Sequence, residues 1–600
     1  MSGKKDTARR IATGLACAAL AWLTLASAGG VADAASAAQG YANLPVVKPV
    51  QDCAALAGTP LDHVADTPAR VQSATVIETA KGPFCKVLGN IEPSIGFEVD
   101  LPVQHWTQRY FQGGCGGLCG MRAAGISNAS RCAPALNGEF VVAGDDMGHE
   151  AKMGGPGEAE FARDPQLRID FAYRGNHATA RVAKALIKAY YGQAPRYSYF
   201  MGCSDGGREA LMEAQRFPED FDGISAGDPA ALFQLQNSFY HAWNVLSDRR
   251  ADGSNILLPA KRQLVHDAVI ARCDTLSGVQ DGLLQDPRAC DFKPAALRCA
   301  AGAADTSRCL TDEEVAVVQK LYDGAGDGQG HVYTFGAQRG SEQQWGLPND
   351  AKGTSMSEGM AARSISMVIL PTVSPAEADV SKFAINDANL QRVSQLAPLY
   401  DATNTNLKPF AAHGGKLILW HGWSDTSITP GVSIAYYQGV QKFVGKAATD
   451  RFMRLFLLPG VGHCGGGDGY DQIDLLSPLM AWTELKRAPT QLIAGKTAQA
   501  QGGPGGGPVG GGPPPGGMRM PGPVADAAPV FTATRPVYPY PYIPHYTGKG
   551  DPKDAASYEQ IISPVKLPEA FGSEATQLIG PDNQKSYRVQ DGKLVVASAR

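Results

Sequence analysis

Residues 197–217 read YSYFMGCSDGGREALMEAQRF, and the order of patterns within this stretch decides the fold. A β-prone run at 197–201 leads into a G-x-S-x-G pentapeptide centred on Ser204, and a helical pattern follows at 207–217. Strand, sharp turn and helix in this order form the context in which a serine hydroxyl is raised at the edge of a sheet. The glycines permit the strained turn, and the positive N-terminus of the helix lies beside the hydroxyl. We therefore predict that Ser204 is a nucleophile.

The sequence on both sides of this stretch alternates between strand and helix patterns. β-prone runs occur at 97–101, 110–111, 139–143, 416–420 and 452–458. Helical patterns occur at 178–191 and 475–485. Alternating strands and helices favour a parallel sheet that is covered by helices. Together with the serine turn, this alternation predicts an α/β-hydrolase fold.

The chain of 600 residues is longer than a single core usually becomes, so we expect a second unit within it. From 231 to 403 the sequence is irregular and rich in Gly and Cys. Isolated helices are predicted there at 259–272 and 311–322. We predict an inserted lid domain between two parts of the core, 38–230 and 404–600, because the strands that complete the sheet come only afterwards. An independent tandem domain is the alternative. Within the second part, the Gly- and Pro-rich stretch 501–523 is expected to be a disordered loop.

Residues 1–37 have the pattern of a secretory signal peptide. Basic residues precede an apolar run at 11–28, and small residues follow up to Ala37. A membrane anchor is the alternative, but the run is short. We predict a secreted or periplasmic protein, and the Arg9–Arg10 pair leaves both Sec and twin-arginine export open. No other stretch is apolar enough to span a bilayer, so no membrane association is expected after the signal is removed.

The charge of the chain limits its partners. The formal net charge is -4, and Lys and Arg are scattered along the sequence. Nucleic acid and anionic membrane surfaces select a basic stripe, which this sequence lacks. We therefore expect a small, neutral or weakly charged substrate, no nucleic acid, and a monomer.

Twelve cysteines are present, and removal of Cys17 with the signal peptide would leave eleven. In an exported protein most of them should be paired. The odd number leaves a free thiol, which we expect among Cys115, Cys119 and Cys132. The other cysteines, all predicted to form disulfides, are Cys53, Cys85, Cys203, Cys273, Cys290, Cys299, Cys309 and Cys464.

A serine hydroxyl is a poor nucleophile unless a base takes its proton, and the base is usually oriented by an acid. Asp425 follows the predicted strand at 416–420, and His463 follows the one at 452–458. The chain order Ser, Asp, His is the order found in this fold. We predict that His463 is the general base and that Asp425 orients it. A turn aspartate and a surface histidine are the alternatives.

Each of two cysteines is the immediate neighbour of a predicted catalytic residue. If Ser204 and His463 meet, Cys203 and Cys464 come within the Cα separation of roughly 4.4 to 6.8 Å that a disulfide requires. We predict this bridge, with two free buried thiols as the alternative.

The sequence Gly113-Gly114-Cys115-Gly116-Gly117 follows directly after the predicted strand at 110–111. Such a loop can bring a backbone N–H close to the oxygen that becomes negative in a tetrahedral intermediate. We predict that the oxyanion hole consists of the N–H groups of Gly116 and Asp205. A simple turn is the alternative.

These motifs resemble the tannase and feruloyl esterase family of α/β-hydrolases. The resemblance rests on Cys203-Ser204, on His463-Cys464, on GGREA after the serine and on HGWSD at the acid loop. It covers the chain from Cys53 to about Gly550. The family implies hydrolysis of esters of aromatic acids, with His421 lining the pocket.

The family's lid also carries a calcium loop, and residues 273–283 are similar to it in position and spacing. The resemblance implies a calcium site held by Asp274, Ser277, Val279, Asp281 and Leu283. Ser277 stands where the family usually has a carboxylate, so we expect weaker binding. A metal-free turn is the alternative. Cys273 and Cys290 bracket the loop and would restrict it if bridged.

An aromatic acyl group needs an apolar slot with a few polar groups. We place Trp423 and Met360 in that slot, beside His421. Terephthalate monoester hydrolases of the family carry an Arg and a Phe in the segment that holds Met360 here. We therefore predict feruloyl esters as the substrates, with galloyl esters and terephthalate monoesters as alternatives. A non-catalytic binding protein on the same scaffold is the alternative from another functional class.

Overall fold

The computed structural model describes residues 40–122, 124–151, 157–370, 379–497, 529–565 and 574–597. The predicted signal peptide at 1–37 and the predicted disordered loop at 501–523 lie outside the described residues. Among the described residues, no helix is long and apolar enough to cross a membrane.

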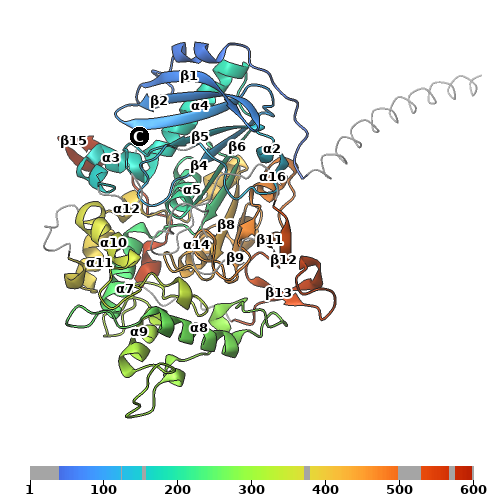
Figure 1. Cartoon of the computed structure of the whole chain (residues 1–600). Helices are drawn as coiled ribbons and strands as arrows, with labels where there is room; N and C mark the ends of the chain where they lie inside the picture. The colour runs from blue at the N-terminus through green and yellow to red at the C-terminus, as the bar shows by residue number, and fades with distance from the viewer. Residues whose placement is uncertain are drawn as a thin grey trace, which may run out of the picture.

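A nine-stranded sheet runs through the molecule in the order β1-β2-β3-β5-β4-β6-β7-β8-β9 (Figure 1). Its strands are β1 (Ala69–Thr79), β2 (Gly82–Ile91), β3 (Ile95–Pro102), β4 (Arg109–Gly113), β5 (Phe140–Asp145), β6 (Tyr197–Cys203), β7 (Gly223–Gly227), β8 (Lys416–Gly422) and β9 (Met453–Leu458). From β5 through β9 the neighbouring strands are parallel. The first three strands pair antiparallel, and β3 also pairs antiparallel with β5. The predicted α/β-hydrolase fold is confirmed.

Helices cover both faces of this sheet, so its central strands are apolar on both sides. Tyr110 and Phe200 face the core that contains residues of α4 (Gly175–Tyr191), α5 (Asp205–Arg216) and α14 (Gly431–Val444). The next residue on each strand turns to the other face, as the period of two requires. Phe111 and Met201 therefore pack in the second core, with α16 (Leu476–Leu485).

The chain between β7 and β8 forms a group of helices. They are α6 (Phe233–Leu235), α7 (His241–Ser247), α8 (Pro259–Cys273), α9 (Asp312–Asp323), α10 (Met356–Arg363), α11 (Asp387–Ser394), α12 (Ala397–Tyr400) and α13 (Lys408–His413). In Figure 1, α7, α8 and α9 lie together below the sheet. A third core, which includes Val265, Val318 and Trp345, packs α8 against α9. Residues of α6, α7, α10, α11, α12 and α13 join the first core instead. The disulfides Cys273–Cys290 and Cys299–Cys309 tie loops of this insertion.

The small sheets that follow β9 are not predicted by any sequence pattern. They are formed by β10 (Gln472–Ile473), β11 (Leu492–Thr497) and β12 (Phe531–Val537), by β13 (Tyr542–Tyr546) with β14 (Tyr558–Ile562), and by β15 (Tyr587–Gln590) with β16 (Lys593–Val596). The remaining short helices are α2 (Ala133–Leu136), α3 (Pro165–Ile169) and α15 (Lys446–Thr449). β13 and the insertion are in contact, since Tyr546 donates its backbone N–H to the Ser277 carbonyl at 2.6 Å.

Candidate active site

Ser204 lies in the sharp turn between β6 and α5, with φ 66° and ψ -121°. A non-glycine residue at positive φ is strained, and such strain persists only where the surroundings enforce it. The neighbouring glycines make the turn possible, because a Cβ on Gly202 would lie 2.3 Å from the Gly206 carbonyl oxygen. On Gly207 it would lie 2.2 Å from the Gly227 carbonyl oxygen. The turn has the geometry expected of a nucleophile elbow.

His463 and Asp425 complete a hydrogen-bonded chain with this serine. The Nε2 atom of His463 is 2.9 Å from Ser204 Oγ, and its Nδ1 atom is 2.7 Å from Asp425 Oδ2. The other carboxylate oxygen of Asp425 accepts the backbone N–H groups of Ser427 and Ile428 at 2.8 and 3.0 Å. Both residues come from loops at the C-terminal ends of neighbouring strands, β8 and β9.

The charges around Asp425 and His463 favour an ionised Asp425 beside the His463 imidazole. Burial acts to raise the pKa of Asp425, but the facing imidazoles of His463 and His421 outweigh it and hold that pKa well below its usual range. Burial acts to lower the pKa of His463, and the Asp425 carboxylate outweighs it, so the net shift is upward. An ionised Asp425 fixes the Nδ1–H tautomer of His463, which leaves Nε2 able to accept the Ser204 proton.

Cys203 and Cys464 form a disulfide with a Cα–Cα separation of 5.9 Å. It joins the residue before Ser204 to the residue after His463, so the serine turn and the histidine loop are tied covalently. The predicted pairing therefore agrees with the structure. Cys53–Cys85 is a further bridge, at the sheet edge.

Asp228 contacts this site, although the sequence favours Asp425 over it as the acid because Asp228 lies upstream of the insertion. It follows β7, is fully buried, and lies at φ 37°. Its Oδ1 accepts the Gly422 N–H at 2.8 Å, and its Oδ2 accepts the Cys464 N–H at 2.7 Å. One carboxylate thus joins the end of β8 to the histidine loop. Burial raises its pKa to about 6, against the opposing effect of His421.

The predicted pocket residues lie in three different surroundings. His421 is fully buried, with Nδ1 2.8 Å from Ser433 Oγ and Nε2 2.8 Å from the Ile428 carbonyl oxygen. Trp423 is 3% exposed and carries the Arg288 guanidinium over its ring at 5.2 Å. Met360 is half-buried on α10, where its sulfur lies 3.5 Å from an Arg363 nitrogen. Each of the three side chains thus packs against a different partner.

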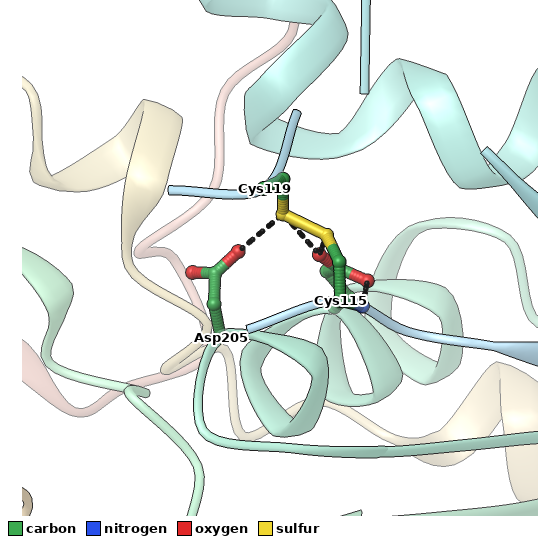
Figure 2. A group of neighbouring side chains, drawn as sticks. Cys115, Cys119 and Asp205 are labelled. Carbon is green, nitrogen blue, oxygen red and sulfur yellow. Dashed lines mark hydrogen bonds between the residues drawn. A yellow bond between two sulfur atoms is a disulfide. The ribbon is translucent and has the colours of Figure 1, made fainter. Parts of the chain in front are cut away.

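The loop after β4 is closed by a disulfide between Cys115 and Cys119 (Figure 2). Gly116, between them, is buried, and Asp205 begins α5 beside the loop. Asp205 forms an ion pair with the fully buried Arg208, at 2.6 Å. This disulfide leaves Cys132 as the free cysteine of the described residues, in agreement with the predicted group. Burial raises the pKa of the Cys132 thiol to about 12, which disfavours the reactive thiolate at neutral pH.

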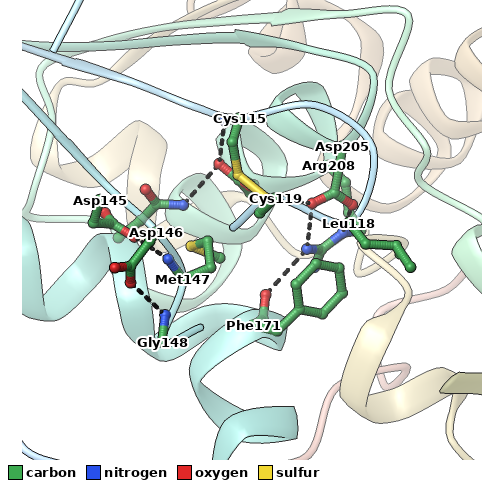
Figure 3. Close-up of a disulfide and its surroundings, with 12 residues drawn as sticks. Cys115, Leu118, Cys119, Asp145, Asp146, Met147, Gly148, Phe171, Asp205 and Arg208 are labelled. Atoms are coloured by element: carbon green, nitrogen blue, oxygen red, sulfur yellow. Dashed lines mark hydrogen bonds and ion pairs between the residues drawn. A yellow bond between two sulfur atoms is a disulfide. The ribbon is translucent and has the colours of Figure 1, made fainter. Parts of the chain in front are cut away.

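The turn after β5 lies on the other side of the Cys115–Cys119 disulfide (Figure 3). It carries Asp145 and Asp146, both buried, and burial raises the pKa of Asp145 to about 7. The Oδ1 atoms of these residues accept backbone N–H groups of Met147 and Gly148 within the turn, at 2.9 and 3.0 Å. These acids stabilise the turn and do not touch Ser204 or His463 through any hydrogen bond among the described residues.

The loop predicted to hold calcium lies in the insertion and contacts the C-terminal strands. Asp274 Oδ1 and Asp281 Oδ1 are buried and have no hydrogen-bond partner among the described residues. Arg535 of β12 pairs with the other oxygen of Asp281 at 2.5 Å. The Ser277 hydroxyl donates to the Val279 carbonyl at 2.6 Å. Unlike a carboxylate at this position, it brings no negative charge to the loop. Two buried carboxylate oxygens without hydrogen-bond partners are suitable ligands for a hard cation such as Ca²⁺.

Comparisons with known proteins show the family of the chain. Residues 75–561 match the family model described as tannase and feruloyl esterase. The mono(2-hydroxyethyl) terephthalate hydrolase of Piscinibacter sakaiensis is 30% identical, over 82% of this chain and 87% of that protein. The feruloyl esterase B of Aspergillus niger is 28% identical, over 69% of this chain and 80% of that protein. The crystal structure of feruloyl esterase B from Aspergillus oryzae superposes with a TM-score of 0.68 at 24% identity, covering 85% of this chain and 100% of that one. The chain belongs to the tannase and feruloyl esterase family.

Proposed function

We propose that this protein is an exported serine esterase that cleaves esters of aromatic acids through an acyl-enzyme. The observation that carries the proposal is the hydrogen-bonded chain from Ser204 through His463 to Asp425, with distances of 2.9 and 2.7 Å. The family to which the chain belongs supports ester hydrolysis. The five disulfides of the described residues support export, because such bonds persist in oxidising compartments.

The reaction follows from the roles that this geometry permits. His463 Nε2 takes the proton of Ser204 as Oγ attacks the ester carbonyl carbon, and Asp425 stabilises the imidazolium that forms. His463 then gives the proton to the departing alcohol, which leaves an acyl group on Ser204. A water molecule attacks the acyl-enzyme in the same way, with His463 again as base, and the carboxylic acid departs.

The negative oxygen of the tetrahedral intermediates needs hydrogen-bond donors fixed in advance. We assign this role to the N–H groups of Gly116, in the loop closed by Cys115 and Cys119, and of Asp205, at the N-terminus of α5. The helix N-terminus adds a favourable partial positive charge.

Feruloyl and related hydroxycinnamoyl esters are the substrates that we put first. Galloyl esters and terephthalate monoesters are the alternatives, since relatives of the chain carry names of both feruloyl and terephthalate esterases. Met360, Trp423 and His421 remain the pocket residues in this proposal. A binding protein that keeps the scaffold without the reaction is the alternative from another class.

Two measurements test the proposal. A serine-reactive fluorophosphonate should label Ser204 in the folded protein and should fail to label Ser204→Ala, whereas no labelling would favour the binding protein. The values of kcat/KM for methyl ferulate, methyl gallate and a terephthalate monoester then rank the substrates. A preference for either of the last two would refute the feruloyl assignment and leave the esterase in place.

Calcium is part of the proposal, as a structural ion. Asp274 and Asp281 would hold it through their carboxylates, and Ser277, Val279 and Leu283 would supply further oxygens. When bound, the ion would neutralise the two carboxylates and hold the loop. Arg535 already neutralises part of that charge, which supports weak binding.

A further inference from the structure

Glu209 is a buried carboxylic acid that takes no part in the chain from Ser204 to Asp425. It lies one turn into α5 and is 1% exposed. Its side chain reaches the disulfide that closes the predicted oxyanion loop. Figure 2 shows that disulfide between Cys115 and Cys119, with Asp205 at its other side.

The contact between this acid and the disulfide favours a proton on the acid. Glu209 Oε1 lies 2.8 Å from Cys115 Sγ and 3.2 Å from Cys119 Sγ. A disulfide sulfur carries no hydrogen, so in a hydrogen bond between these groups only the carboxyl group can be the donor. A neutral acid can donate its O–H to the sulfur, which is a weak acceptor, whereas an ionised acid would face the sulfur lone pairs unfavourably.

The charged groups around Glu209 agree with a neutral acid. Burial, followed by the nearby Asp205 carboxylate, raises the pKa of Glu209 well above its usual range, and Asp145 acts in the same direction. Arg208 is the cation that opposes this shift, but its guanidinium is bound to Asp205 at 2.6 and 2.9 Å. Arg208 also donates to the Ala172 carbonyl at 2.8 Å.

The second oxygen of Glu209 fixes the main chain of the loop. Oε2 accepts the Cys115 N–H at 3.2 Å and the Asn176 side-chain N–H at 2.9 Å. Asn176 in turn accepts from Gln112 of β4 at 3.0 Å. The carboxyl group packs closely against the loop, because a Cβ on Gly114 would lie 2.7 Å from Glu209 Oε2. The acid thus joins the loop to α5, to α4 and to the strand from which the loop emerges.

We propose that Glu209 is a positioning residue, which as a neutral acid holds the loop bearing Gly116 against the helix that begins at Asp205. The two N–H groups assigned to the oxyanion hole belong to these two elements. The hydrogen bonds of Glu209 to Cys115 therefore set the distance between the two donors. This role rests on the proposed function, since it concerns the stabilisation of the tetrahedral intermediate.

Two substitutions of Glu209 separate a neutral acid from an ionised one. Glu209→Gln keeps one donor for the sulfur and one acceptor for the Cys115 N–H, so kcat should stay within about threefold of wild type. Glu209→Leu removes both, and kcat should fall by about 10² to 10³, as it does when one oxyanion donor is lost, while KM changes only a few-fold. Glu213→Gln is the matched control, because Glu213 is a buried acid one turn further along α5, and its kcat should equal that of wild type.

An infrared measurement tests the protonation state without relying on activity. The difference spectrum between wild type and Glu209→Gln at neutral pH should contain the C=O band of one protonated carboxylic acid. Absence of that band, or a kcat for Glu209→Gln as low as that of Glu209→Leu, would overturn the proposal. If the wild type itself hydrolyses no ester, the proposed function fails, and the infrared band still decides the state of Glu209.

Discussion

Asp228→Asn is the substitution that best tests how the site is held together. The carboxylate accepts the N–H groups of Gly422 and Cys464 with its two oxygens, at 2.8 and 2.7 Å. An amide keeps one acceptor and places an NH₂ group against the other N–H. One buried donor then lacks a partner, at a cost of about 1 to 3 kcal/mol. The relief of this conflict should move the loop that carries His463, and a displacement of about 1 Å costs roughly 100-fold in rate.

The assay is kcat and KM for an ester that the wild type hydrolyses. We expect kcat to fall by about 100-fold and KM to change only a few-fold, because Asp228 touches the loops and not the substrate. Asp222→Asn is the matched control, since Asp222 lies at the other end of β7 and accepts the Ser198 N–H at 2.8 Å. A kcat for Asp228→Asn equal to that of the control would refute the reasoning.

The pH dependence of stability gives a second readout for Asp228. Its pKa is raised to about 6 by burial, from about 3.9 in an unfolded chain. An acid with a raised pKa stabilises the folded state at low pH, and this contribution is lost as the pH rises through the folded pKa. The free energy of unfolding of Asp228→Asn should therefore fall less than that of wild type between about pH 4 and pH 6.

Ser204→Ala should lower kcat by on the order of 10⁴ to 10⁶ with the melting temperature unchanged, and activity within about tenfold of wild type would contradict the nucleophile assignment. Excess chelator should lower the melting temperature, and Ser277→Asp should tighten calcium binding; an unchanged melting temperature together with no calcium by elemental analysis would remove the ion from the proposal. Replacement of Cys203 and Cys464 by serine should reduce kcat far more than substrate affinity, and alkylatable thiols at both positions in active enzyme would exclude a functional bridge.

The hydrogen-bonded arrangement of Ser204, His463 and Asp425 could be predicted because each residue has a local sequence signal. Ser204 sits in a pentapeptide between a strand and a helix, and Asp425 and His463 each follow an apolar strand, so strand direction alone brings them to one edge of the sheet. Asp228 also follows a strand, but β7 is the five-residue run GISAG, too short and too rich in glycine to be recognised. Because β7 was not predicted, no role was assigned to Asp228 at its end.

What the sequence left open depends on contacts between distant segments, which no local pattern encodes. The Cys115–Cys119 pairing could not be chosen from three candidates, because the free thiol is set by the buried place of Cys132 beside Met480. The surroundings of Trp423 likewise depend on Arg288 of the insertion, whose guanidinium lies over the Trp423 ring.

The arrangement of buried acids has a consequence for stability as well as for rate. Asp228 and Glu209 are both buried, and burial of a polar group costs free energy that hydrogen bonds only partly return. Neither residue belongs to the hydrogen-bonded chain, yet each fastens a loop that carries a proposed catalytic group. Apolar replacement of Asp228 leaves the Gly422 and Cys464 N–H groups buried without an acceptor, and replacement of Glu209 does the same to the Cys115 N–H. Each should therefore lower the free energy of unfolding by about 1 to 3 kcal/mol and also lower kcat. A purely structural role would lower the stability alone, because kcat would then be unchanged in the molecules that remain folded.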